Sequence, residues 1–97
     1  MDPKKIQDLV GHFYGRSKKE LLGRTGNQKN EPRSMLIFLL RRLNGMSHAE
    51  IANVTKTENA NAVSQVLYRF NKERRSNSDI DETVQTMTNN LLSYVKS

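Results

Sequence analysis

The chain contains no cysteine and no tryptophan, and only two prolines and five glycines among its 97 residues. Without cysteine it can form no disulfide, no Cys-ligated zinc site and no thiol nucleophile, and the lack of cysteine suits a reducing cytoplasm. The hydrophobic fraction is low, at 35%. This length predicts one small domain, residues 1–97, with a modest core and little room for a deep cofactor cleft. We therefore expect no cofactor.

Long hydrophobic runs are also missing. The longest extends over six residues, from Met35 to Leu40, whereas a membrane-spanning helix needs about 20 apolar residues. No apolar run follows the N-terminal residues 1–5, so the sequence predicts no secretory signal. These features predict a cytoplasmic protein without a membrane partner.

Positive charge is what the chain has in excess. Sixteen Lys and Arg residues face ten Asp and Glu residues, which gives a formal net charge of +6. Residues 1–75 hold 15 basic and 7 acidic side chains, a net charge of +8, and residues 76–97 carry −2. The excess indicates a polyanionic partner, with nucleic acid favoured over an anionic membrane surface. The surface that binds this partner is expected in the first three quarters of the chain.

The apolar residues recur every three or four positions, which predicts helices along the whole chain and no strand. The expected helices cover residues 6–14, 17–22, 31–43, 47–54, 60–75 and 80–96. Residues 35–40 are apolar on every side of their helix, so this helix should be the central and most buried one. The sequence thus predicts an all-α bundle of five or six helices.

Polar residues mark where these helices should begin and end. Two Ser-x-x-Glu capping boxes, at 17–20 and 47–50, should each open a helix, because the serine oxygen and the glutamate satisfy orphan backbone N–H groups. Gly15 should end the first helix, and residues 76–79 should separate the last two. Residues 23–30 contain no apolar side chain and are expected to form an exposed loop.

Two helices joined by a short polar turn, within residues 47–75, form a helix-turn-helix candidate. Asn61, Gln65 and Arg69 recur at every fourth position and should share the outer face of the second helix. Asn and Gln can form paired hydrogen bonds with adenine in the major groove, where the N-terminal part of such a helix meets base edges. The same pattern also fits a plain helical bundle, on which polar outer faces are the default.

Residues 33–52, RSMLIFLLRRLNGMSHAEIA, resemble the C-terminal DNA-binding domain of the bacterial replication initiator DnaA. The stretches VGHFY at 10–14 and SKKELL at 17–22 look like the opening helix and the capped second helix of that domain. The stretch ERRSNSDI at 73–80 looks like the start of its closing part, and the resemblance covers residues 4–95.

The resemblance implies a Trp-repressor-like helix-turn-helix bundle that binds duplex DNA. It implies that Arg33, at the start of the long helix, enters the minor groove, and that Arg41 helps to contact the DNA backbone. The predicted DNA-contacting set is Arg24, Lys29, Arg33, Arg41, Lys56, Asn59, Asn61, Ser64, Gln65 and Arg69. Within it, base edges are assigned to Asn59, Asn61 and Gln65, and phosphates to Arg24, Lys29, Arg41 and Lys56.

The chain departs from that family where the recognition helix begins. The family carries a basic residue, Asp, His, two hydroxyl residues and Val, whereas residues 58–63 read ENANAV, which keeps only Val63. The base-reading residues therefore differ from those that recognise the usual initiator box. The 62–64 version, Ala-Val-Ser, also resembles a DnaA-type helix-turn-helix found on some transposases that cleave single-stranded DNA.

No Gly-x-x-x-x-Gly-Lys phosphate loop occurs, so the chain would be the DNA-binding part of an initiator or transposase-like protein, or a stand-alone relative. His12 and His48 are the only histidines, and no acidic residue or histidine lies four residues after either of them. No nucleophile with its base can be assembled either. We therefore expect neither an enzyme nor a metal site.

The aromatic residues Phe13, Tyr14, Phe38, Tyr68 and Phe70 fall within helical patterns and are expected in the core, with Tyr68 at its edge. The closing helix, residues 80–96, has an apolar stripe along one side. This stripe is expected to pack back onto the bundle, since a small domain needs that apolar area for its core. Pairing with a second copy through this stripe is the alternative.

The sequence as a whole predicts sequence-specific binding of double-stranded DNA, and with it association with the nucleoid. The expected role is in replication initiation or its regulation, or as part of a transposase-like protein. The alternative is a helical protein-interaction module with a degenerate helix-turn-helix, which the departure at residues 58–63 motivates.

Overall fold

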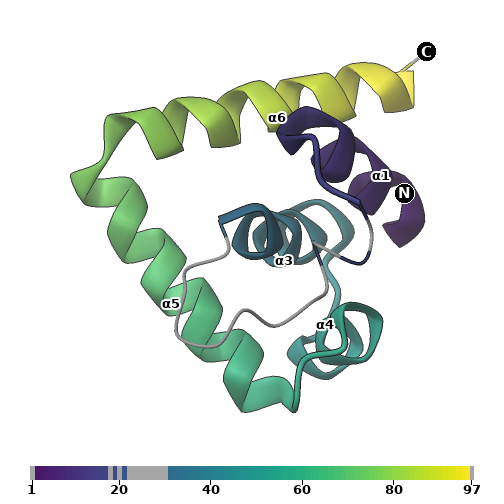
Figure 1. Cartoon of the computed structure of the whole chain (residues 1–97), viewed down its shortest axis with the longest axis vertical. Helices are drawn as coiled ribbons and strands as arrows, with labels where there is room; N and C mark the ends of the chain where they lie inside the picture. The colour runs from purple at the N-terminus through teal and green to yellow at the C-terminus, as the bar shows by residue number, and fades with distance from the viewer. Residues whose placement is uncertain (1, 18, 20, 22–30, 97) are drawn as a thin grey trace.

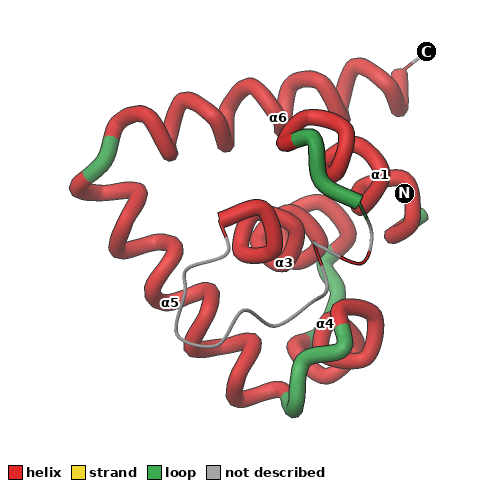
Figure 2. The backbone as a smooth tube through the Cα atoms, viewed as in Figure 1, coloured by secondary structure: helices red, strands yellow, loops and turns green. Residues whose placement is uncertain are grey.

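The computed structural model describes residues 2–17, 19, 21 and 31–96, and no side chains at 94–96. In these residues the chain forms five α-helices and no strand, which confirms the predicted all-α class (Figures 1 and 2). The helices are α1 (Pro3–Tyr14), α3 (Glu31–Asn44), α4 (His48–Thr55), α5 (Ala60–Ser76) and α6 (Ser78–Lys96). The predicted loop at 23–30, with Arg24 and Lys29, lies outside the described residues.

The predicted helix at 17–22 is described only in part. The backbone N–H of Leu21 donates to the carbonyl of Ser17 at 3.0 Å, and the Leu21 side chain is buried. Glu20, and with it the capping box at 17–20, lies outside the described residues.

Helix α3 occupies the centre of the fold, as its apolar run predicts. Helices α1, α4 and α5 pack around it, and α6 runs from the C-terminal end of α5 to α1 (Figure 1). Every side chain from Met35 to Leu40 is fully buried except that of Phe38, which keeps 6% of its surface exposed. The other helices contribute their own buried side chains to the core: Ile6 and Val10 of α1, Ile51 and Ala52 of α4, Val63 and Phe70 of α5, and Ile80, Val84, Met87 and Leu91 of α6. The stripe of α6 therefore packs back onto the bundle.

The helix ends follow from local capping chemistry. Asp2 caps α1, because its Oδ1 accepts the backbone N–H of Lys4 at 2.9 Å. Gly15 ends α1 in the left-handed conformation, with φ 65°, as predicted. The capping box of α4 is confirmed, with Glu50 N–H to Ser47 Oγ at 3.1 Å and Ser47 N–H to Glu50 Oε1 at 3.2 Å.

The break predicted at 76–79 is wrong in extent. Asn77 alone is non-helical, with an extended backbone of φ −135° and ψ 103°. Its Oδ1 accepts the backbone N–H of Asp79 at 3.0 Å, so one residue ends α5 with its backbone and caps α6 with its side chain. Because the cap replaces a loop, Ser76 and Ser78 stay within the two helices. None of the described helices is long and apolar enough to cross a membrane.

A hydrogen bond between Tyr14 and Glu31 links the end of α1 to the start of α3. The phenol Oη donates to Oε2 of Glu31 at 2.9 Å, and Tyr14 is half-buried. Burial raises the pKa of Tyr14 above 10.0, and the hydrogen bond and negative charge of Glu31 raise this pKa further.

We expect the stabilising effect of Tyr14 to disappear at high pH. Its folded pKa lies above the unfolded value of about 10, so its contribution is present below pH about 10 and is lost as pH rises beyond it. Chemical denaturation of wild type and Tyr14→Phe tests this: the difference in free energy of unfolding should shrink above that pH. A difference that stays constant would contradict the assignment.

Gly11 lies where α1 passes close to the backbone that follows Gly15. A Cβ at Gly11 would lie 2.7 Å from the carbonyl oxygen of Arg16 and 3.3 Å from Cδ1 of Leu21. The backbone N–H of Arg16 donates to the Gly11 carbonyl at 2.8 Å, which fixes this approach. The missing side chain therefore lets residues 15–17 turn back against α1.

Gly11→Ala should destabilise the fold by about 1–3 kcal/mol, because the clash is with backbone and needs the turn to shift. In an ordinary helix interior the same exchange is stabilising by about 0.5–1 kcal/mol, so the sign is diagnostic. Thermal and denaturant unfolding, followed by circular dichroism, measure it. Ser64→Ala, at an exposed helical position, is the control and should be neutral or slightly stabilising.

Candidate nucleic-acid interface

Helices α4 and α5 are joined by four residues, 56–59, and pack against each other and against α3. Lys56 takes the left-handed conformation, with φ 56°, and its backbone N–H donates to the carbonyl of Ala52. The N–H of Thr57 donates to the same carbonyl at 2.9 Å. Asn59 then caps α5, since its Oδ1 accepts the N–H of Ala62 at 2.8 Å.

A chain of hydrogen bonds holds this turn against α3. Arg33 Nη2 donates to Thr57 Oγ1 at 2.7 Å, and Thr57 Oγ1 lies 2.7 Å from Thr55 Oγ1. Thr55 is fully buried and donates its one hydroxyl proton to the carbonyl of Ile51 at 2.7 Å. Thr57 must therefore donate to Thr55. Each group donates to the next: Arg33 to Thr57, Thr57 to Thr55, and Thr55 to the backbone of α4. We call these three side chains the turn relay.

Arg33 of α3 thus lies beside the turn that precedes α5, and its guanidinium binds Thr57. Arg41 belongs to α3 and lies near the start of α4, far from the turn. Its Nη1 donates to the carbonyl of Met46, in the segment between these two helices, at 2.8 Å. Lys56 is exposed at the turn itself. The structure therefore brings Arg33, Lys56 and Asn59 together and leaves Arg41 apart from them.

The outer face of α5 carries the other predicted residues. Asn61, Ser64, Gln65 and Arg69 are all exposed, whereas Val63 and Phe70 on the opposite side are buried in the core. Asn61 and Gln65 lie in the first two turns of the helix, where base-reading residues of helix-turn-helix proteins are found. The spacing correctly places these side chains on one outward face.

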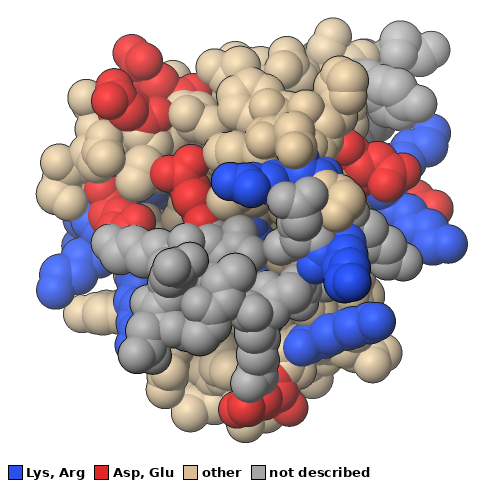
Figure 3. All heavy atoms as spheres, in the orientation of Figure 1, with Lys and Arg blue, Asp and Glu red and all other residues tan. Residues whose placement is uncertain are grey.

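Sequence reasoning missed three further members of this face. Tyr68, Lys72 and Arg75 are exposed and lie seven, eleven and fourteen residues after Asn61, which is the same helical period. This helical spacing was the signal in the sequence that could have identified all three residues. Basic side chains gather over the upper half of α5 in Figure 3, at the left, and acidic ones over the first turns of α6. We call Asn61, Ser64, Gln65, Tyr68, Arg69, Lys72 and Arg75 the α5 outer face.

Arg74 points the other way. It forms an ion pair with Asp81 of α6 at 2.9 Å, and its guanidinium lies 4.9 Å from the centre of the Phe38 ring. Arg42 lies over the same ring at 5.7 Å. These two cations cover the outer edge of the core, where Phe38 and Phe70 contact each other with ring centres 5.3 Å apart.

Phe13, Tyr14, Phe38 and Phe70 were predicted to lie in the core, with Tyr68 at its edge, and this is wrong for Phe13 and Tyr68. Phe38 and Phe70 are buried and Tyr14 is half-buried, but Phe13 is 47% exposed and Tyr68 is 71% exposed. Phe13 is held edge-on against Tyr14, with ring centres 5.2 Å apart. Tyr68 lies about 20° from Asn61 around the helix axis, which turns it away from Val63 and Phe70.

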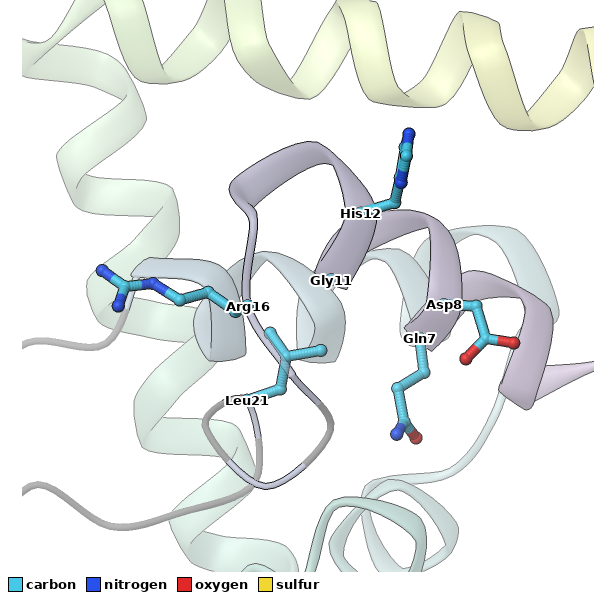
Figure 4. Close-up of a pocket in the computed structure, with 6 residues that line it drawn as sticks. All are labelled: Gln7, Asp8, Gly11, His12, Arg16 and Leu21. Carbon is cyan, nitrogen blue, oxygen red and sulfur yellow. The ribbon is translucent and has the colours of Figure 1, made fainter.

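Two of the hollows on the described surface are lined by charged side chains. One of about 100 Å³ is lined by Gln7, Asp8, Gly11, His12, Arg16 and Leu21 (Figure 4). The side chains of Asp8, His12 and Arg16 point in different directions, so they share no common ligand position (Figure 4). An open groove of about 450 Å³ between α5 and α6 is lined by Asn71, Arg74, Arg75 and Asp81. In the part of the chain that is described, no three His, Asp or Glu residues group as metal ligands would.

Compared with known proteins, the chain matches no protein-family model and no curated sequence. The resemblance to the DnaA domain therefore stays a prediction from the residues that carry it. The functional argument rests on the α5 outer face and the turn that positions it.

Thr57→Val tests the turn relay. The change keeps the β-branched shape but removes the acceptor of Arg33 and the donor to Thr55, which should cost about 1–3 kcal/mol of unfolding free energy. Thr86→Val, at an exposed position of α6, is the matched control and should stay within about 0.5 kcal/mol of wild type. Equal unfolding midpoints for the two variants would show that the relay adds no stability.

Proposed function

We propose that the chain binds double-stranded DNA by placing the α5 outer face in the major groove. Helix α4 and the 56–59 turn would support α5 as the first half of a helix-turn-helix. One observation carries the proposal: α5 is fixed in the core through Val63 and Phe70, so its amides and cations face outward together. Amides near the N-terminus suit base edges, and cations farther along suit phosphates.

The residues divide into base-reading and phosphate-binding groups. Asn61 and Gln65 would hydrogen-bond to base edges, with Ser64 beside them. Arg69 and Lys56 would bind phosphates on either side of the groove. Arg41 would bind a further phosphate, as would Arg24 and Lys29 of the segment that precedes α3. Asn59 uses its side-chain oxygen to cap α5, and its amide nitrogen would donate to a base.

Arg33 has a double role in this proposal. Entry into the minor groove, which the DnaA resemblance implies, requires its guanidinium to leave Thr57 or to share it with the DNA. While bound to Thr57, Arg33 instead holds the turn that orients α5. Its position at the turn supports a contact beside the recognition helix in either arrangement.

The resemblance extends the proposal to a cellular role. The chain would act in replication initiation or its regulation, or as the DNA-binding part of a transposase-like protein. Because residues 58–63 keep only Val63 of the family signature, the target would differ from the usual initiator box.

Salt dependence tests duplex binding against the protein-interaction alternative. A chain that contacts five phosphates should lose affinity with a slope of about −4.5 in log K against log salt, which is about 500-fold between 50 and 200 mM. Fluorescence anisotropy with a labelled random-sequence duplex measures this slope. Absence of binding at low salt would overturn the proposal and favour a protein partner.

Substitutions should separate base reading from phosphate binding. After selection of a preferred sequence from a random duplex pool, Asn61→Ala with Gln65→Ala should lower the preference for it about 10-fold or more. Lys56→Gly should instead weaken all duplexes alike and lower the salt slope by about 0.9, and it relieves the left-handed backbone without breaking a fold contact. Asn89→Ala with Asn90→Ala, two exposed amides of α6, is the matched control and should change neither quantity.

A further inference from the structure

Tyr68 is the most exposed of the large hydrophobic side chains in the described residues, at 71%. It stands in the middle of the α5 outer face, three residues after Gln65 and four before Lys72. Asn61 and Tyr68 differ by about 20° around the helix axis and by about 10 Å along it. An aromatic ring therefore continues the line of amides along the same side of α5.

The neighbours of Tyr68 argue against a protein-docking patch. Asn61, Gln65 and Lys72 surround it with polar and charged groups on its own helix. The other exposed large apolar side chains, Phe13 and Leu92, belong to α1 and α6. An isolated ring among amides and cations offers little apolar area to a protein, but it suits a surface on which small apolar groups alternate with polar ones.

The floor of the DNA major groove is such a surface. An A·T base pair presents there the N6 amino group and N7 of adenine, which Asn and Gln read, next to the C5-methyl group of thymine. The methyl is the one apolar feature of that edge, and apolar side chains contact it. The two side-chain chemistries on this face of α5 thus match the two halves of one base-pair edge.

We propose that Tyr68 is a specificity-determining residue that packs its ring against the C5-methyl group of thymine in the major groove. This inference rests on the proposed function and deepens it: Asn61 and Gln65 read adenine, and Tyr68 reads a thymine farther along the groove. The chain then prefers a site rich in A·T pairs over the stretch that α5 covers.

Deoxyuridine provides the test, because it pairs as thymine does but lacks the methyl group. Each thymine of the selected duplex is replaced in turn by deoxyuridine, and affinities are measured by fluorescence anisotropy at fixed salt. At one position wild type should bind the deoxyuridine duplex about fourfold more weakly, the factor expected for one buried methyl group. Tyr68→Ala should bind both duplexes equally, and Tyr68→Phe should keep the wild-type ratio. Phe13→Ala removes a different exposed aromatic and should also keep that ratio.

Several results would overturn the proposal. If wild type binds every deoxyuridine duplex as well as the thymine duplex, there is no methyl contact. If Tyr68→Phe loses the ratio as Tyr68→Ala does, the effect belongs to the hydroxyl group and not to the ring. If Tyr68→Ala weakens binding to single strands alone, Tyr68 stacks on bases. Absence of all duplex binding by wild type would instead overturn the proposed function, so the two failures are distinguishable.

Discussion

Burial of the six apolar residues of α3 is the constraint on which the rest of the fold depends. A helix that is apolar around its whole circumference must be covered on every side, and α1, α4 and α5 supply that cover with one stripe each. Each covering helix is thereby fixed in rotation about its own axis. The outward face of α5 is thus a consequence of how Val63 and Phe70 contact the core, and the polar residues on it are held in place at no cost to the core.

The turn between α4 and α5, residues 56–59, sets the position of α5 along its own axis. Lys56 in the left-handed conformation, the cap from Asn59 and the turn relay together specify where α5 begins. The relay crosses from α3 to the end of α4, so the helix that forms the core also orients the helix proposed to read DNA. The same arginine that the DnaA resemblance assigns to the minor groove is therefore part of the internal framework.

Much of this could be predicted from the sequence, because periodicity and capping are local signals. The central helix, the 47–50 capping box and the shared face of Asn61, Gln65 and Arg69 all follow from spacing within one helix. Tyr68 was predicted at the edge of the core because aromatic residues usually pack there, although its spacing from Asn61 indicates the outer face. The turn relay could not be predicted, since it joins residues 24 positions apart through side-chain geometry. Its one trace in the sequence is Thr55, a hydroxyl residue at a position of α4 that faces the core.

The single-residue joint at Asn77 has a mechanical consequence. Two helices of 17 and 19 residues meet there, and the Arg74–Asp81 ion pair braces the angle between them. Farther along, α6 packs on α1, and α1 packs on α3, which in turn carries α5 (Figure 1). The four helices thus form a closed frame in which α5 is one side. A force applied to the exposed side of α5 is shared by the whole frame, so the helix can meet another large molecule without tilting away from it.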